Sequence, residues 1–202
     1  MKSVLIQLSK LSKTFYRKYQ TEIKDLIVFG SFMRGKLEPQ DIDVLIIFKK
    51  KVDKDIEYEF KKLLLPTLKN VSLISKTEET YQEPSFDARE GILFEGYSLI
   101  KQGLIAAEFG FISLGLFFYS TKEMSNLNKT KFYYALNGRK PAKGIVEKLK
   151  GIKLSDNLIA FPLDKIEPAK AFFNFWKMEY RYVPTLIPQR LGRKEIIGTG
   201  RK

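Results

Sequence analysis

Gly30-Ser31-Phe32-Met33-Arg34-Gly35, followed after five residues by Asp41-Ile42-Asp43, is the stretch that decides the fold of this chain. A short apolar run, residues 25–29, precedes it, and a β-branched run follows it as far as Phe48. Short apolar runs bounded by turn residues predict buried strands. We therefore expect strands over residues 25–29 and 41–48, joined by a sharp Gly-Ser turn, a short helix over 32–34 and a polar loop.

The polar residues of this stretch form a candidate site for a phosphorylated ligand. Residues i and i+2 of a strand point to the same side, so Asp41 and Asp43 project together and can hold a divalent cation. The backbone of Gly30 and Ser31, with the Ser31 hydroxyl, can cradle a triphosphate, and Arg34 can neutralise its charge. Phosphoryl and nucleotidyl transfer need these parts. The alternative is an ordinary turn followed by a strand that begins with two acids.

Taken together, the strand, the Gly30-Ser31 turn, Arg34-Gly35 and the Asp41-x-Asp43 strand resemble the signature of the DNA polymerase beta-type nucleotidyltransferase superfamily. The resemblance covers about residues 20–102, and the phrase at residues 91–99 is similar to the end of the minimal domains. It implies transfer of a nucleoside monophosphate from an NTP to a hydroxyl, with magnesium held by three carboxylates. By resemblance, Gly30 and Ser31 bind the triphosphate, while Asp41 and Asp43 hold the metals.

One position departs from that family pattern. The family's third carboxylate lies on the next core strand, where this chain has the run 71–74 with Ser72 at the matching position. A serine neither holds a metal ion nor takes a proton well. Three other acids, Glu57, Glu59 and Glu95, are substitutes that the spacing does not single out.

Composition removes several other chemistries. The chain has no cysteine and no histidine, which excludes disulfides, zinc fingers, thiol nucleophiles and imidazole acid–base catalysis. A metal site must use oxygen ligands, which favours Mg²⁺ or Mn²⁺. The N-terminal segment does not read as a signal peptide, and the longest apolar stretch, Leu104–Tyr119, has 16 residues including Glu108. We expect a soluble, cytoplasmic protein without membrane contact.

Charge is distributed unevenly between the two halves. Residues 1–100 hold 17 Lys/Arg against 15 Asp/Glu, whereas residues 101–202 hold 19 against 8. A near-neutral half joined to a strongly basic half suggests that the second half faces a polyanion. RNA is the favoured partner, alone or within a ribonucleoprotein particle. A lysine-rich surface that serves thermal stability is the alternative.

The basic half also carries aromatic residues, which suit phosphate contacts combined with base stacking. At least half of Phe132, Tyr133 and Tyr134 are expected in a core, because Phe132 and Leu136 recur at helical spacing from Ser125 to Gly138. An extended segment over 178–187 containing Pro184 is expected at a sheet edge. The predicted nucleic-acid contacts are Lys129, Lys131, Arg139, Lys140, Lys143, Arg190, Arg193 and Lys194.

These features predict an α/β (α+β) protein in three parts. Residues 1–103 form a nucleotidyltransferase-like mixed sheet with flanking helices, residues 104–188 a small basic α+β domain, and residues 189–202 a flexible basic tail. The predicted function is Mg²⁺-dependent transfer of a nucleoside monophosphate from NTP to a hydroxyl of RNA or another polyanionic acceptor. The alternative is a catalytically degenerate fold that binds RNA or a ribonucleoprotein such as the ribosome.

Overall fold

The chain divides into two compact units, Met1–Phe109 and Gly110–Lys202. The computed structural model describes residues 2–68 and 70–190. The sequence placed the boundary after Gly103, whereas β5 (Gly103–Leu104) and α5 (Ile105–Glu108) belong to the first unit. Ile105 explains this difference, because it is buried in the apolar cluster beneath the first sheet. The predicted tail contacts Arg193 and Lys194 lie outside the described residues.

The first unit is built on a five-stranded mixed sheet with the order β3-β2-β1-β4-β5. Strands β1 (Ile23–Phe29) and β2 (Ile42–Phe48) run antiparallel, β2 and β3 (Val71–Thr77) run parallel, and the short β4 (Tyr97–Ser98) pairs antiparallel with β1 and β5. The central strands are buried on both faces, as their continuous apolar runs predict. This mixed sheet with helices confirms the nucleotidyltransferase-type fold predicted for the first half.

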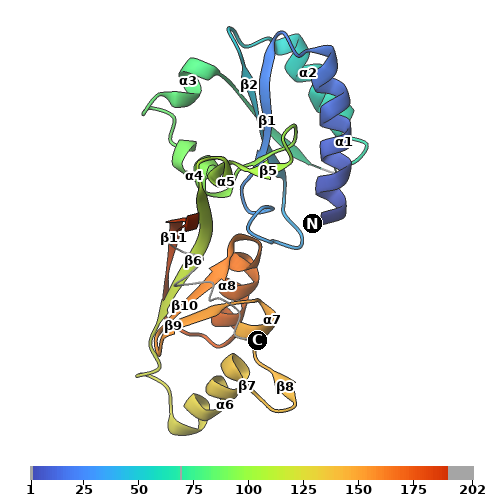
Figure 1. The fold of residues 1–202 in the computed structure, drawn as a ribbon. Helices are drawn as coiled ribbons and strands as arrows, with labels where there is room; N and C mark the ends of the chain where they lie inside the picture. The colour runs from blue at the N-terminus through green and yellow to red at the C-terminus, as the bar shows by residue number, and fades with distance from the viewer. Residues whose placement is uncertain (1, 69, 191–202) are drawn as a thin grey trace. The chain divides into compact units, whose positions relative to one another are not determined.

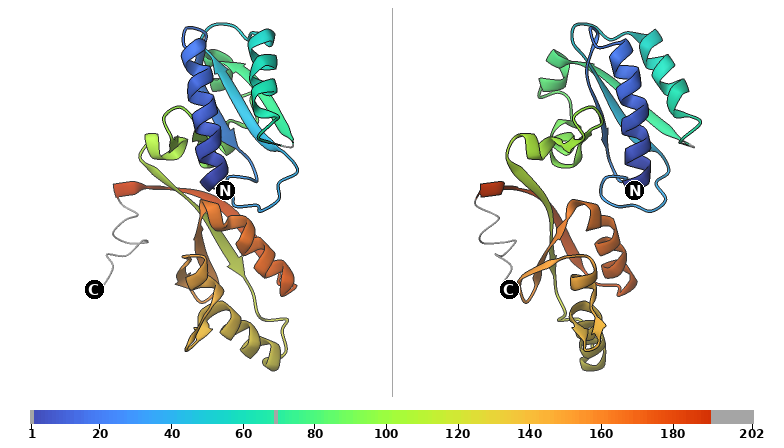
Figure 2. Two further views of the ribbon diagram at one scale, coloured as in Figure 1. Left: turned by 90° about the vertical axis from the view of Figure 1, so that its right-hand side faces the viewer. Right: turned by 45° about the vertical axis from the view of Figure 1, so that its right-hand side comes forward.

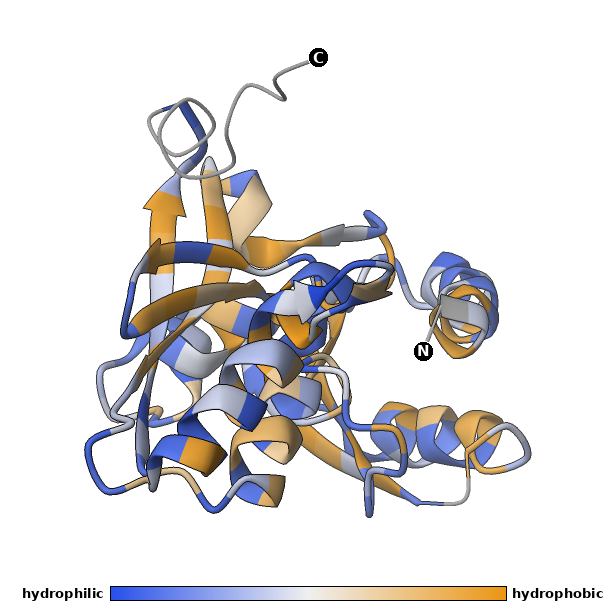
Figure 3. Ribbon diagram, turned by 90° about the horizontal axis from the view of Figure 1, so that it is seen from below, coloured by the Kyte–Doolittle hydropathy of each residue, from blue (hydrophilic) through white to orange (hydrophobic). Residues whose placement is uncertain are grey.

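Helices cover both faces of that sheet (Figures 1 and 2). On one face lie α1 (Lys2–Lys18) and α2 (Lys54–Leu64), which bury Phe15 and Phe60 against alternate residues of β2. On the other face lie α3 (Glu78–Gln82), α4 (Arg89–Glu95) and α5, around a second apolar cluster. Seen end-on, α1 is hydrophilic on one side and hydrophobic on the other (Figure 3). The two faces therefore have separate cores.

Asp53 caps the N-terminus of α2. Its carboxylate accepts hydrogen bonds from the backbone N–H groups of Asp55 and Ile56, at 3.0 and 3.1 Å. We expect Asp53→Ala to destabilise the first unit by about 1 kcal/mol, because two N–H groups lose their acceptor. Urea denaturation followed by far-UV circular dichroism measures this loss. Asp53→Asn is the matched control, and a loss equal to that of the alanine variant would contradict the capping role.

The second unit contains a four-stranded antiparallel sheet with the order β11-β6-β10-β9. Its elements are β6 (Phe111–Tyr119), α6 (Asn126–Asn137), the β7–β8 hairpin (Gly138–Arg139 and Ala142–Lys143), α7 (Ile145–Lys148), β9 (Ile152–Ser155), β10 (Leu158–Pro162), the 3₁₀ turn η1 (Leu163–Lys165), α8 (Ile166–Phe175) and β11 (Tyr180–Pro188). Ser125 caps α6, as predicted, by accepting a hydrogen bond from the N–H of Asn128. Strand β11, with Pro184, is an edge strand, which confirms the prediction from its proline.

Aromatic side chains form the core of this unit. Phe117 of β6 is fully buried and contacts Phe161 and Phe173, with ring centroids 5.5 Å apart in both cases. Phe132 of α6 is also buried and packs edge-on against Tyr119. The expectation that at least half of Phe132, Tyr133 and Tyr134 lie in a core is wrong: Phe132 is buried, whereas Tyr133 and Tyr134 are 56% and 41% exposed, because consecutive positions of α6 face different sides.

One local prediction is wrong. Residues 32–34 form no helix but a succession of tight turns, in which Met33 N–H donates to Gly30 O at 3.0 Å and Gly35 N–H to Phe32 O at 3.1 Å. Two glycines with positive φ, Gly30 and Gly35, bracket the segment and close it before a helical turn can continue. Within the described residues, no helix is both long and apolar enough to cross a membrane.

Candidate active site around the turn after strand β1

The turn that leaves β1 is shaped by Gly30. Its φ is +83°, a conformation that strongly favours glycine, and a Cβ at this position would overlap Oδ2 of Asp43. The backbone and the aspartate therefore approach one another because the residue has no side chain. Phe29, just before the turn, pairs with Asp43 across the β1–β2 ladder.

The two predicted aspartates flank the first residue of β2. Asp41 precedes the strand and is exposed, whereas Asp43 is the second residue of the strand and is partly buried. Burial raises the pKa of the Asp43 carboxyl, and the negative charge of Asp41 raises it further. The structure thus brings these two carboxylates together, as the strand periodicity predicts.

Ser72 lies beside Asp43 in the parallel β2–β3 ladder. Its hydroxyl donates a hydrogen bond to the Asp43 carboxylate and so partly offsets the rise in the pKa of Asp43. Strand β3 contains no acidic residue. Within residues 2–68 and 70–190, no three acidic side chains form a group that could hold a metal ion.

Glu95, the last residue of α4, is the acid that the structure brings to the turn. It is buried; its Oε1 accepts the Gly30 N–H at 2.9 Å, and its Oε2 accepts from Nη1 of Arg34. Its charge raises the pKa of Asp43, while that of Arg34 lowers it. Sequence spacing did not single out Glu95. This residue reaches the turn because β4, which follows α4, pairs with β1, and this pairing joins residues that are far apart in the sequence.

The other two acidic candidates do not reach the site. Glu57 and Glu59 belong to α2, whose buried residues pack with Val44 on one face of the sheet. Asp43 is adjacent to Val44 in the strand and therefore faces the opposite side. Glu59 instead binds Lys18 at 2.8 Å and Tyr19. Neither acid can replace the missing third carboxylate.

Two donors at the turn are open to a ligand. The backbone N–H groups of Ser31 and Phe32 have no hydrogen-bond acceptor among the described residues, whereas the N–H of Gly30 is used by Glu95. Gly30 was predicted to contact the phosphate, but in this structure its backbone N–H already donates to Glu95. Successive backbone amides in a turn bind anions. The donors suited to a phosphate are these two amides, the Ser31 hydroxyl and Arg34.

The residues present fit a magnesium ion that arrives with a triphosphate. Mg²⁺ is commonly held by one or two carboxylates together with substrate phosphate oxygens rather than by an all-protein cage. Asp41 and Asp43 provide two such carboxylates, and burial, with a further contribution from the charge of Asp41, raises the pKa of Asp43. A bound cation would stabilise the ionised form of this partly buried carboxylate.

The predicted nucleic-acid contacts form one cluster and one outlier. Lys129 and Lys131 lie on α6, while Arg139, Lys140 and Lys143 lie on the hairpin that directly follows this helix. Arg190 follows β11 near Phe111, at the end of the sheet opposite Tyr119, from which the chain continues to α6. Lys143 forms an ion pair with Glu147, with 2.6 Å between Nζ and Oε1.

Comparison with known proteins agrees with this geometry. The family model described as "Nucleotidyltransferase domain" matches residues 8–93, which lie in the first unit and include the turn, both aspartates and Ser72. The match ends two residues before Glu95. No curated protein and no solved structure matched the chain. Residues 8–93 are thus a nucleotidyltransferase domain, which supports nucleotidyl transfer in general terms.

Proposed function

We propose that the nucleotidyltransferase domain at residues 8–93 uses Mg²⁺ and an NTP to transfer a nucleoside monophosphate to a hydroxyl of RNA or another polyanionic acceptor. The observation that carries this proposal is the close approach of the Asp43 carboxylate to Gly30, beside the open amides of Ser31 and Phe32. A carboxylate for a metal ion and donors for a triphosphate thereby meet at one turn.

Each group has a distinct role in the proposed reaction. The amides of the turn and Arg34 bind and orient the triphosphate, and the acceptor hydroxyl attacks the α-phosphorus as the bond to pyrophosphate breaks. Asp41 and Asp43 would hold the metal ion, which when bound neutralises charge on the phosphate oxygens. Glu95 keeps the turn and Arg34 in position through its two hydrogen bonds.

The experiment is a transfer assay on the full chain. It incubates the protein with Mg²⁺, NTPs labelled at the α-phosphate and mixed RNA acceptors, and it detects label that becomes covalently attached to the acceptor. The proposal expects labelled acceptor with Mg²⁺ and none with EDTA. Binding of Mg-ATP without label on any acceptor would refute the transfer reaction.

Ser72 favours a second candidate, a domain that binds nucleotide or RNA without catalysis. In the β2–β3 register Ser72 occupies the place beside Asp43, and a hydroxyl holds a metal ion less well than a carboxylate. This candidate expects Mg-ATP to raise the melting temperature of the wild type while no acceptor is labelled. Transfer that appears only in Ser72→Asp would establish it.

The second unit is proposed to bind the acceptor. Residues 110–190 carry 14 Lys/Arg against 6 Asp/Glu, and this excess of positive charge suits a polyanionic acceptor.

We expect affinity for single-stranded RNA to fall steeply with salt, because each phosphate contact releases counterions. Removing residues 191–202, with four Lys/Arg, is expected to flatten the plot of log affinity against log salt by as much as about three units. Fluorescence anisotropy at several salt concentrations measures the slope. Equal slopes for the two chains would refute a contribution of this segment.

A further inference from the structure

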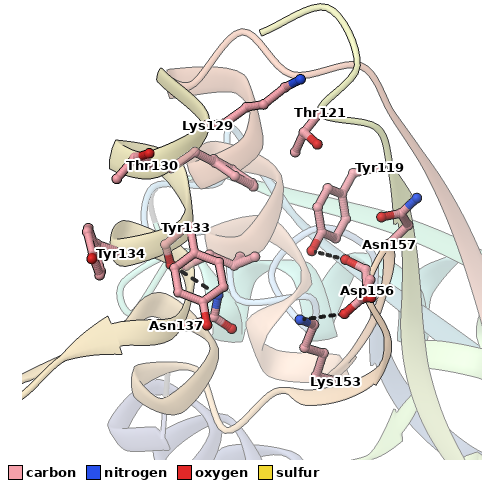
Figure 4. A pocket seen from close by; sticks show the side chains of 12 residues that line it. Tyr119, Thr121, Lys129, Thr130, Tyr133, Tyr134, Asn137, Lys153, Asp156 and Asn157 are labelled. Carbon is pink, nitrogen blue, oxygen red and sulfur yellow. Dashed lines mark hydrogen bonds and ion pairs between the residues drawn. The ribbon is translucent and has the colours of Figure 1, made fainter. Parts of the chain in front are cut away.

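The second unit contains a pocket that the proposed transfer reaction does not use. Its volume is about 420 Å³, within the range of about 300–1,000 Å³ that is usual for ligand sites. It lies between α6, the end of β6 and the turn that joins β9 to β10 (Figure 4). Tyr133 and Asn137 of α6 face Asp156 and Asn157 of that turn across the pocket (Figure 4).

The lining combines an apolar floor with an exposed aromatic ring. Phe132 and Leu136 are almost completely buried beneath the pocket, whereas Tyr133 is 56% exposed. An exposed aromatic face at a pocket is a surface on which a nucleic-acid base can stack. Tyr119 is only 6% exposed and donates its hydroxyl to the carbonyl oxygen of Asp156 at 2.7 Å, and the guanidinium of Arg139 lies over the ring of Tyr134, so Tyr133 is the most exposed aromatic ring at the pocket.

The charge around the pocket is positive and partly unneutralised. Residues 119–157 hold nine Lys/Arg against three Asp/Glu. Lys153 is paired with Asp156 at 3.2 Å, but Lys129, which also lines the pocket and is partly buried, has no ion-pair partner in the described part of the chain. A partly buried ammonium group without a counter-ion favours an anionic ligand.

Polar groups complete the site. The amide of Asn137 donates one hydrogen bond, to the Tyr133 carbonyl at 3.1 Å, and no hydrogen bond of the described residues uses its oxygen. The side-chain amide of Asn157 likewise has no partner within residues 2–68 and 70–190. An aromatic face, a cation and open amides correspond to the base, the phosphate and the base edge of one nucleotide.

We propose that this pocket receives one base of a single-stranded nucleic acid, which stacks on Tyr133 while its phosphate contacts Lys129. The inference rests on the proposed function, since it specifies how the acceptor strand is held. It predicts a preference for single strands, because the bases of a duplex are paired and cannot enter the pocket. Arg139, whose guanidinium lies 5.3 Å from the ring centroid of Tyr134, adds positive charge next to α6.

The test measures binding of a fluorescein-labelled single-stranded oligoribonucleotide, about ten nucleotides long, to the full chain by anisotropy. Tyr133→Ala is expected to weaken binding about ten- to hundredfold, and Tyr133→Phe to retain it within about threefold, because the ring does the stacking. Lys129→Gln should lower the slope of log affinity against log salt by about 0.7. Alanine is a good helix former, so the exposed Tyr133 can be replaced without loss of α6.

Phe175→Ala is the matched control. This ring belongs to α8 of the same unit, is 80% exposed and does not line the pocket. Its removal should change affinity by less than about twofold. The inference is overturned if Tyr133→Ala has no larger effect than Phe175→Ala, if a duplex of equal length binds as tightly, or if the wild type binds no oligonucleotide.

A second measurement separates this inference from the proposed function. Stabilisation by Mg-ATP depends on Asp43 in the first unit and should be the same in Tyr133→Ala and in the wild type. If Mg-ATP stabilises the protein but Tyr133→Ala still binds RNA as tightly as the wild type, the proposal for the pocket is refuted. The proposed transfer reaction is then unaffected. No stabilisation by Mg-ATP, with the expected loss of RNA binding in Tyr133→Ala, refutes the transfer reaction and leaves the pocket standing.

Discussion

Asp43→Asn is expected to reduce nucleotidyl transfer by about 10²–10³-fold and to abolish the rise in melting temperature caused by Mg-ATP. Asp43 is the carboxylate that lies against Gly30, and an amide does not supply the negative charge that a metal ion needs. A ligand at 100 times its Kd stabilises a protein by about 2.7 kcal/mol, so its loss is readily seen in melting curves. The transfer assay and differential scanning fluorimetry measure the two effects.

The same variant should have the opposite effect on the protein without ligand. Burial and the charge of Asp41 raise the pKa of Asp43 in the folded state, so the ionised carboxylate is unfavourable there at neutral pH. Asp43→Asn should therefore melt at a higher temperature than the wild type at pH 7. The difference should shrink as the pH falls through the raised pKa, since the wild type then gains a proton. Ligand binding and stability are in opposition at this residue.

Asp87→Asn is the control for both measurements. Asp87 is an exposed acid of the same unit, in the loop before α4 and outside the turn around Gly30. Its change should leave transfer, the effect of Mg-ATP and the melting temperature unaltered. If Asp43→Asn kept the full Mg-ATP effect, the turn after β1 would not be the nucleotide site.

The sequence predicted the parts of the site that lie close together along the chain. The Gly-Ser turn and the two aspartates belong to adjacent strands, and period-two alternation in β2 sufficed to place both carboxylates on one side. The sequence comparison also placed Ser72 at the position of the family's third carboxylate, and the structure pairs Ser72 with Asp43. A parallel crossover through one helix aligns the starts of β2 and β3 in this way.

Long-range contacts were not predictable in this way. Glu95 reaches Gly30 because the chain passes through α3 and α4 before β4 pairs with β1, and no local pattern encodes that path. The pocket beside α6 needs the turn between β9 and β10, some 20 residues further along the chain. Tyr133 and Phe132 are neighbours in sequence, yet only packing decides that one ring is exposed and the other buried.

Glu95→Ala is expected to destabilise the first unit by about 3 kcal/mol. Glu95 is 6% exposed and binds two groups of the turn, so its removal leaves the buried Gly30 N–H without an acceptor and takes a carboxylate from Arg34. Urea denaturation followed by circular dichroism measures the change. Trp176, the single tryptophan, lies in the second unit. The urea concentration at the midpoint of the transition in its fluorescence should therefore be unchanged.

Glu90→Ala is the matched control on the same helix. Glu90 pairs with Arg89 at the surface, with 70% of its side chain exposed, and such pairs contribute less than about 1 kcal/mol. Glu95→Gln should fall between the two alanine variants, since its carbonyl oxygen can still accept the Gly30 N–H while the charge is lost. Equal effects of Glu95→Ala and Glu90→Ala would mean that the turn keeps its shape without the carboxylate. Gly30, with its positive φ, would then be the main determinant of the shape of the nucleotide site.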